Sequence, residues 1–266
     1  MAETPQATYL LNESPYEAER QRLLQLEAEW GGKTHRHLQE LGVSAGWRCL
    51  EVGAGAGGVA AWLAERVGAS GQVVATDINP RFLDAAQLPP QVEIRRHDIT
   101  SDPLEEGVYD LVHCRFLLIH LKDPQAVLTR MARALRPGGW LLVEEPVTEP
   151  VAVLGMPDAA QFDRLSRQAF EILRETGMNV WLGPQLPQMA RTAGLQPVGG
   201  EQTTRLIRGG SPDAASYLGA TVTLGAPLLR RGLVTPESVA AQQAAFRNPE
   251  FQFLSFPVLS VWGQRP

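Results

Sequence analysis

The chain opens with a stretch whose apolar residues recur at the spacing of an amphipathic helix. Between Ser14 and Trp30 they are mostly three or four positions apart, and Ser14-Pro15 supplies a helix cap and a first-turn proline. A second helix is predicted over residues 34–41, ending at Gly42. We expect residues 1–45 to form an N-terminal helical cap over the binding edge of the domain that follows.

From residue 48 onward, short apolar runs alternate with helical patterns. The predicted strands are 48–52, 72–76, 92–96, 109–114 and 140–144. Strands that are apolar almost throughout and alternate with helices indicate a parallel sheet covered on both faces. Ligands of such sheets bind beyond the carboxyl ends of the strands. Four charged residues fall at those ends: Glu51, Asp77, Asp98 and Arg115.

The alternation changes after residue 146. We predict helices over 158–177 and 183–193, and strands over 196–207 and 256–262. A helical insertion between those two strands, from 212 to 248, is predicted to be interrupted at 225–227 and at Gly232. Residues 46–266 then form one domain with helical insertions at about 148–182 and 211–248.

Composition and charge exclude several classes of protein. The 266 residues are 44% hydrophobic and 20% charged, which is ordinary for a globular chain. The net charge of -5 argues against a nucleic-acid partner. No apolar run approaches the ~18 residues of a membrane span, and the N-terminus does not resemble a secretory signal. Because Cys49 and Cys114 lie in predicted core strands, we expect a reduced, cytoplasmic protein.

The most informative motif is the turn after the first strand, Glu51-Val52-Gly53-Ala54-Gly55-Ala56-Gly57-Gly58. Glycines let the backbone turn tightly and approach a ligand closely, and the helix start beyond them offers N–H groups to an anionic group. The spacing fits both the dinucleotide pattern G-x-G-x-x-G and the pattern G-x-G-x-G. Alone, the turn therefore predicts a nucleotide-like cofactor without saying which.

Three acids sharpen this prediction. Asp77 ends the second strand, 24 residues after Gly53, where a carboxylate can accept hydrogen bonds from both ribose hydroxyls. Asp98 could accept from the amino group of adenine, and Ile99 could offer its N–H to a ring nitrogen. Glu51 could orient the turn's N–H groups or meet a cationic ligand group. The alternatives are a helix cap, a solvated turn and a satisfied strand-end acid.

Together these segments strongly resemble the class I S-adenosyl-methionine-dependent methyltransferases, looking most like the bacterial enzymes of natural-product pathways. The resemblance covers about residues 40–145. It rests on the segments 50–57 (LEVGAGAG), 74–77 (VATD), 96–98 (RHD), 109–112 (YDLV) and 135–139 (LRPGG). It implies an α/β fold with a Rossmann-like, doubly wound, seven-stranded sheet. That sheet is mostly parallel, has an antiparallel last strand, and carries helical cap elements.

The resemblance also implies S-adenosyl-methionine as cofactor and S-adenosyl-homocysteine as product. The glycines would approach the methionine moiety, and Cys114 or Arg115 would line the sulfonium side. Tyr9 and Arg22 would close over the carboxylate. The full set of predicted cofactor-binding residues is Tyr9, Arg22, Glu51, Gly53, Ala54, Gly55, Gly57, Asp77, Ile78, Asp98, Ile99, Cys114 and Arg115.

The acid–base residue is harder to predict, because the cofactor itself activates the methyl group. His120 is the candidate general base: it follows the fourth strand by a few residues, and imidazole titrates near neutrality. A structural role for His120 is the alternative, and His35 or His37 could serve as a base instead. The five histidines form no metal-binding constellation.

We therefore predict methyl transfer to a small organic acceptor, at oxygen before nitrogen or carbon. The apolar and aromatic content of the predicted cap segments favours an apolar or aromatic acceptor. Two alternatives stay open: a nicotinamide-dependent oxidoreductase, and a protein of this fold that has lost transfer and acts as a cyclase or binding module. The sequence also leaves a homodimer open.

Overall fold

The computed structural model describes residues 16–147, 153–154, 167–168, 173–175 and 177–266. Its centre is a seven-stranded sheet with the order β3-β2-β1-β4-β5-β10-β7. The strands are β1 (Arg48–Val52), β2 (Gln72–Asp77), β3 (Val92–Arg96), β4 (Tyr109–Arg115), β5 (Leu135–Pro146), β7 (Val198–Thr203) and β10 (Val258–Gln264). The first five are parallel, and β10 runs antiparallel between β5 and β7. The predicted Rossmann-like sheet with an antiparallel last strand is confirmed.

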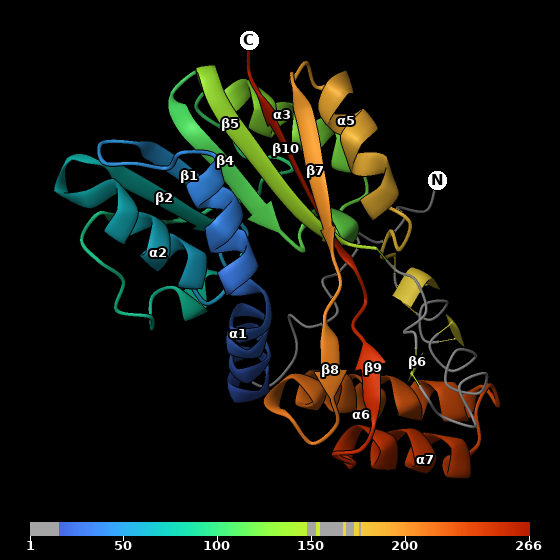
Figure 1. Ribbon diagram of the computed structural model, residues 1–266. Coiled ribbons are helices and arrows are strands. Elements are labelled where there is room, and N and C mark those ends of the chain that lie inside the picture. Colours follow the sequence, from blue (N-terminus) through green and yellow to red (C-terminus); the bar gives the residue numbers. More distant parts are fainter. Residues whose placement is uncertain (1–15, 148–152, 155–166, 169–172, 176) are drawn as a thin grey trace.

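Helices cover both faces of this sheet (Figure 1). Helices α1 (Tyr16–Glu40) and α2 (Gly58–Val67) lie on one face, and α3 (Pro124–Ala134) and α5 (Leu186–Thr192) lie on the other. Alternate residues of each strand point to opposite faces. Leu50 and Val112 therefore join one apolar core, whereas Cys49 and Leu111 join the other. No helix among the described residues is long and apolar enough to span a bilayer.

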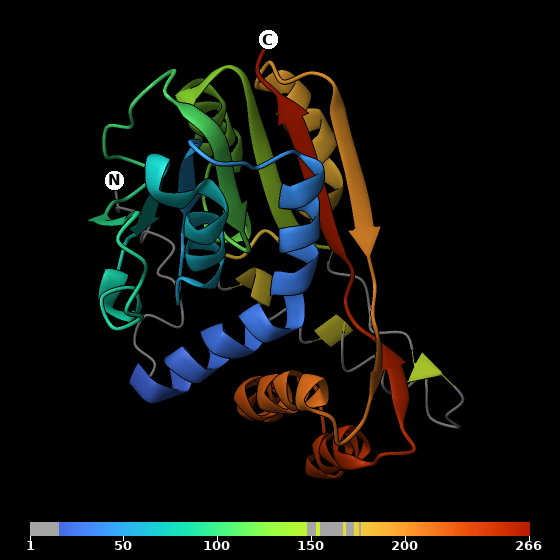
Figure 2. The same cartoon turned by 60° about the vertical axis from the view of Figure 1, so that its left-hand side comes forward.

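The two predicted N-terminal helices form a single helix, α1, which corrects the sequence interpretation. The helix continues through Gly31-Gly32, the pair that separated the two predictions. A side chain at Gly31 would collide with Glu27, because its Cβ would lie 2.2 Å from the Glu27 carboxylate. Figure 2 shows α1 bent and extending past the lower edge of the sheet. The glycine pair thus accommodates a bend and a folded-back carboxylate rather than a break.

The predicted strand 196–207 is also corrected, because it divides between two sheets. Residues after β7 form β8 (Leu206–Arg208), which pairs with β9 (Gln252–Leu254) in a small second sheet that also contains β6 (Val153–Leu154). The division falls at Arg205, whose backbone N–H donates to the Ser255 hydroxyl while its carbonyl accepts from the Ser255 N–H. Most of the predicted helix 158–177 lies outside the described residues.

The insertion between β8 and β9 contains two helices, α6 (Pro212–Arg230) and α7 (Pro236–Arg247). The predicted interruption at 225–227 is wrong, because the backbone of α6 remains helical through those residues. Helices α6 and α7 and strands β8 and β9 enclose their own apolar cluster around Phe246 and Phe253. We call these four elements the cap. In Figure 1 the cap lies below the edge of the main sheet, beside the first half of α1.

Candidate active site

The glycine turn connects β1 to α2 at the carboxyl edge of the sheet. Gly53, Gly55 and Gly57 have φ values of +72°, +56° and +82°, which side chains disfavour. The N–H groups of Gly53 and Ala54 both donate to the Thr76 carbonyl, which ties the turn to β2. The predicted tight, side-chain-free turn is therefore present where a ligand would meet the sheet.

Gly57 is also closely packed, which yields a stability prediction. A Cβ there would lie 3.0 Å from Leu88 and 3.1 Å from Leu83. Gly42 has a similar φ of +87°, but a Cβ there would meet no atom within 4 Å, so Gly42→Ala is the matched control. We expect Gly42→Ala to lower the free energy of unfolding by about 1–2 kcal/mol, because alanine disfavours this backbone conformation. Gly57→Ala should lower it by more. Urea unfolding measures both; equal costs would mean that the contacts with Leu83 and Leu88 do not matter.

Asp77 ends β2 beside the turn. Its Oδ2 accepts from the Gly55 N–H at 3.0 Å and its Oδ1 accepts from the Asn79 N–H at 2.9 Å, so the carboxylate is held at a fixed place. Burial raises the pKa of Asp77, and the two amide hydrogen bonds oppose that shift. The next residue, Ile78, is 55% exposed and offers an apolar surface to a flat ring.

Asp98 lies in the turn after β3, and its carboxylate holds that turn together. Its Oδ1 accepts from the Thr100 hydroxyl at 2.6 Å and from the Thr100 N–H at 2.9 Å. The Thr100 hydroxyl contributes most to lowering the pKa of Asp98, so the group is ionised. Ile99 is buried in the core. The roles of both residues toward adenine remain predictions.

The end of β4 contributes Cys114 and Arg115. Cys114 is fully buried in the core, which leaves its backbone as the part nearest to a ligand at the sheet edge. Arg115 points to the opposite face, toward α1. Its guanidinium donates to the Thr34 hydroxyl at 2.8 Å and to the Glu27 carboxylate at 2.5 Å.

Glu51 belongs to a buried polar network under α1. Its carboxylate contacts Nδ1 of His113 at 2.7 Å, and Nε2 of His113 lies 3.4 Å from Glu144. Burial alone would lower the pKa of His113, but the two carboxylates raise it to about 9. Glu51 therefore holds a charged imidazole, while the turn's amides bond to Thr76 and Asp77. Its roles toward the turn or a cationic ligand remain predictions.

Glu144 connects this network to the N-terminal helix. It accepts from His37 at 3.1 Å, from the Ser260 hydroxyl at 2.7 Å and from the Thr34 hydroxyl. Burial opposes ionisation, yet the hydrogen bonds from His113 and His37 hold the pKa of Glu144 well below its usual value. The network thus fastens α1 to β1, β4 and β5. His37, considered above as a base, is 1% exposed and committed to this network.

His120 lies after β4 in a short 3-10 turn (Leu118–His120), and its electrostatic environment includes α1. Burial and, to a smaller extent, the Arg22 cation lower the pKa of His120 to about 4, although Glu19 opposes both effects. Arg22 makes a bidentate contact with Glu19, at 2.8 and 2.7 Å, and Glu19 is only 3% exposed. The structure therefore gathers His120 and Arg22 on one side of the site. Tyr9 lies outside the described residues.

Glu145 is a further site residue, and it supports the loop that carries His120. It is fully buried, and its Oε1 accepts from the N–H groups of Leu117 and Leu118 at 3.0 and 2.6 Å. Its Oε2 has no hydrogen-bond partner among the described residues. Burial raises the pKa of Glu145 to about 8, against the effect of the backbone amides. The carboxyl is therefore mostly protonated at neutral pH.

The protonated state of Glu145 predicts how stability depends on pH. Between the ordinary value of 4.5 and the raised value of about 8, the folded protein keeps a proton that the unfolded chain releases. Stability should therefore fall as pH rises through that window. Glu145→Gln imitates the protonated group and should make the free energy of unfolding less dependent on pH. Glu145→Ala leaves two amides unpaired and should lower the free energy of unfolding by about 1–3 kcal/mol. Urea unfolding at several pH values tests this; an unchanged pH slope in Glu145→Gln would contradict it.

Several of these residues carried no signal in the sequence. Glu19, Glu27 and Glu145 stood out neither by motif nor by spacing, because their roles depend on contacts between distant elements. For His113, the only sequence feature that indicated a role in the network was the alternation of charged and apolar residues along β4. Among the described residues, no group of three or more His, Cys, Asp or Glu side chains is arranged to hold a metal ion.

These residues fit an adenosyl sulfonium compound. The turn has room for backbone only, since Cβ atoms at Gly53 and Gly55 would lie 3.2 and 3.3 Å from Leu117 and Leu23. Asp77 is fixed beside it, and the nearby Glu19 carboxylate raises the pKa of Asp77 as a like charge, after the larger effect of burial. The fixed carboxylate can accept hydrogen bonds from ribose hydroxyls next to the turn, as an adenosyl compound requires.

Comparison with known proteins agrees with this arrangement. Residues 50–143 match a family described as a methyltransferase domain. A protein of Strobilurus tenacellus named methyltransferase str2 is 37% identical over 101 residues, covering 37% of this chain and 35% of that protein. A ubiquinone biosynthesis O-methyltransferase of Xanthomonas oryzae is 30% identical over 162 residues, covering 57% of this chain and 66% of that protein. The chain spans less than half the length of the first curated relatives it matches.

Solved structures agree in fold. A phosphoethanolamine N-methyltransferase of Haemonchus contortus, solved with S-adenosylhomocysteine, has a TM-score of 0.62 at 15% identity and covers 100% of this chain and 61% of its own. At that identity the likeness concerns the fold alone. The strand order, the glycine turn and the family match over residues 50–143 together identify a class I S-adenosyl-methionine-dependent methyltransferase domain in this chain.

Proposed function

We propose that this protein transfers the methyl group of S-adenosyl-methionine to a hydroxyl oxygen of a small organic molecule in specialised metabolism. The observation that carries the proposal is the convergence of the glycine turn, Asp77 and the His120 loop at one edge of the sheet, next to the first half of α1. The O-methyltransferase of Xanthomonas oryzae, which is 30% identical over 162 residues, supports oxygen as the acceptor atom.

The cofactor would be held by groups that the fold places in order along this edge. The turn at 53–57 would approach the methionine part, Asp77 would accept from the ribose hydroxyls, and Ile78 and Asp98 would flank the adenine. When bound, the sulfonium supplies an activated methyl group. The remaining task of the protein is to align the acceptor with that group and to exclude water.

The acceptor side would lie where α1 crosses the ends of β4 and β5. A small pocket there is lined by Trp30, Lys33, Thr34, Arg115, Glu144, Thr203, Val258 and Ser260. The ring of Trp30 lies 6.2 Å from that of Phe116 and 5.7 Å from that of Phe256. The three aromatic side chains support an apolar or aromatic acceptor.

Two measurements test the proposal. Calorimetry with S-adenosyl-homocysteine should detect binding, and NADH should not bind; the opposite result would favour the oxidoreductase. Incubation with methyl-labelled S-adenosyl-methionine and a panel of hydroxylated aromatic compounds should then transfer label to an organic product. Binding of the cofactor without transfer to any acceptor would contradict the methyltransferase activity and favour a protein that has kept only the cofactor site.

A further inference from the structure

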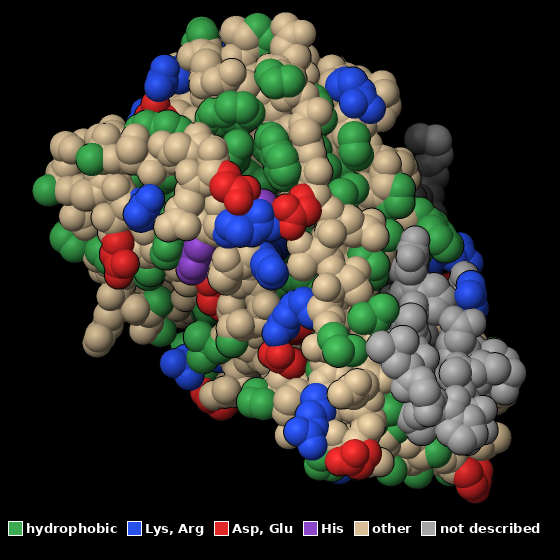
Figure 3. Space-filling view, viewed as in Figure 1, with side chains coloured by type: hydrophobic (Ala, Val, Ile, Leu, Met, Phe, Trp, Pro, Cys, Tyr) green, Lys and Arg blue, Asp and Glu red, His purple; other side chains and the backbone are tan. Residues whose placement is uncertain are grey.

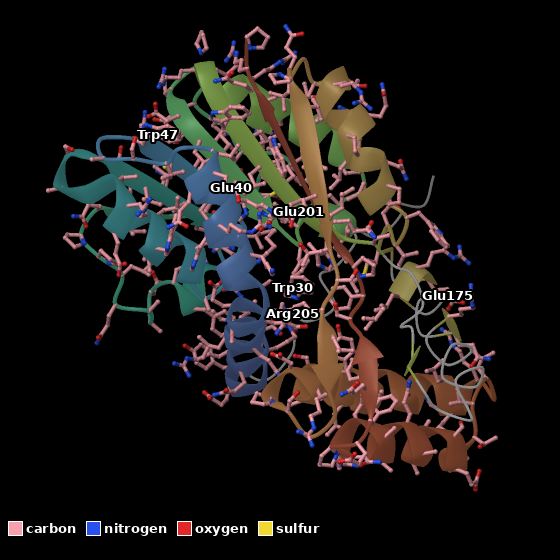
Figure 4. All side chains as sticks on the ribbon, in the orientation of Figure 1. Trp30, Glu40, Trp47, Glu175, Glu201 and Arg205 are labelled. Carbon is pink, nitrogen blue, oxygen red and sulfur yellow. The ribbon has the colours of Figure 1, made fainter. Side chains whose placement is uncertain are left out.

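Three buried polar atoms without partners meet where α1 contacts the cap. They are Oε1 of Glu29, Nε1 of Trp30 and Nη1 of Arg205, and none has a hydrogen-bond partner among the described residues. Glu29 and Trp30 are 6% and 2% exposed. An unpaired buried polar group costs about 1–3 kcal/mol, so three in one region call for an explanation. Figure 4 shows Trp30 and Arg205 in the same space between α1 and the β7–β8 connection.

Glu29 and Arg205 lie slightly too far apart to satisfy each other. Oε1 of Glu29 and Nη1 of Arg205 are 3.6 Å apart, which exceeds hydrogen-bond distance. The other terminal nitrogen of Arg205 contacts Asp213 at 2.5 Å, and the Ser216 hydroxyl lies 3.4 Å from Oε2 of Glu29. An oxygen about 2.8 Å from both unpaired atoms would complete the pair. A hydroxyl group can do this, because it accepts from Arg205 while it donates to Glu29.

The Glu29–Arg205 pair lies beside a seam on the surface that is rich in charged side chains. Figure 3 shows acidic and basic side chains alternating where α1 lies beside β7 and β8, and the ion pairs Arg36–Glu40 and Arg36–Glu201 belong to that seam. Those charges are partly exposed, whereas the Glu29 side chain is 2% exposed. Burial raises the pKa of Glu29 to about 7, although Arg205 lowers it. Glu29 thus differs from its neighbours in being buried, incompletely paired and partly ionised at neutral pH.

The side chains around this position are aromatic, and they are in contact with residues of the candidate active site. The Phe256 ring lies 5.7 Å from Trp30 and 5.9 Å from Tyr217. Trp30 also lies 6.2 Å from Phe116, which directly follows β4, and it lines the pocket that contains Arg115. A continuous set of aromatic side chains, Phe256, Trp30 and Phe116, therefore connects the surroundings of the Glu29–Arg205 pair to the end of β4.

We propose that Glu29, Arg205 and Trp30 recognise the acceptor, and that this acceptor carries a phenol-type hydroxyl on a flat aromatic ring system. The hydroxyl binds between Oε1 of Glu29 and Nη1 of Arg205, and a second polar atom of the molecule accepts from Nε1 of Trp30. This inference rests on the proposed function, because it names the chemical class of its acceptor. The residues come from α1 and from the connection between β7 and β8, outside the matched methyltransferase domain of residues 50–143.

The test uses two probes that differ in one hydroxyl, 6-hydroxyquinoline and quinoline. Each is titrated by calorimetry into the full-length protein saturated with S-adenosyl-homocysteine. We expect 6-hydroxyquinoline to bind at least about tenfold more tightly than quinoline. Glu29→Gln and Trp30→Phe should each weaken its binding by about tenfold or more, as expected for loss of one hydrogen bond in a buried site. Glu17→Gln, at the exposed start of the same helix, is the matched control and should change nothing.

The outcomes separate this inference from the function on which it rests. If S-adenosyl-homocysteine binds but the two quinolines bind equally or not at all, the position holds only water and the inference is overturned. Equal binding by wild type, Glu29→Gln and Trp30→Phe would overturn it as well. Failure of the wild type to bind S-adenosyl-homocysteine would instead overturn the proposed function. Thermal unfolding of each variant establishes that a loss of binding is not a loss of fold.

Discussion

Replacing Asp77 with alanine should weaken binding of S-adenosyl-homocysteine by about 10²- to 10⁴-fold. Each charge-assisted hydrogen bond from a ribose hydroxyl to this carboxylate is worth about 1.5–3 kcal/mol, and the position allows two of them. The same change removes the acceptor for the Gly55 and Asn79 amides, so the turn also loses its anchor. Asp77 would therefore contribute both a direct contact with the cofactor and the shape of the turn.

Asp77→Asn separates these two contributions. Asparagine keeps the size of the side chain and one acceptor oxygen, but it loses the charge. We expect an intermediate affinity for Asp77→Asn, measured by calorimetry with S-adenosyl-homocysteine, and a melting temperature close to that of the wild type. Unchanged affinity in both variants would remove Asp77 from the cofactor site.

The part of the fold that the sequence predicted well is the part governed by local signals. Strands β1 to β4 follow from apolar periodicity, and their bounds agree with the structure to within one residue. Strand β5 begins earlier than predicted, at Leu135, because Leu135 pairs with Tyr109 across the sheet. That pairing joins residues far apart in the chain, so no local pattern announces it.

The errors share the same physical cause. The local sequence around the glycine pair in α1 predicts a break. Contacts with Glu27 and with the network under the helix keep the helix continuous instead. The predicted strand 196–207 divides at Arg205 because its two halves find different antiparallel partners, β10 and β9. Tertiary contacts decided both outcomes, and a single sequence contains no record of them.

The same distinction applies to the candidate site. The glycine turn and Asp77 could be predicted because the chemistry of a nucleotide-like ligand requires those residue types at that spacing. Glu145 and Glu29 could not be predicted, since a buried glutamate looks like any other until its surroundings are known. The network of Glu51, His113 and Glu144 links residues 31 and 62 positions apart, which no motif spans.

Replacing His120 with alanine should lower turnover while leaving cofactor affinity nearly unchanged, if His120 is the general base. The pKa of about 4 keeps its imidazole neutral throughout the neutral range, which is the form that accepts a proton. That low value also makes it a weak base. General bases contribute about 10²–10⁴-fold, and efficiency falls as the pKa moves below the working pH. We therefore expect a loss near the lower end, about 10²-fold.

The pH dependence of turnover distinguishes a base from a structural histidine. Wild-type activity should be level near neutrality and decline as pH falls toward 4, where the imidazole becomes protonated. His120→Gln keeps hydrogen-bonding capacity in a similar volume but cannot take up the proton, so its turnover should match that of His120→Ala. If His120→Gln restores turnover, the residue positions the loop rather than accepting the proton.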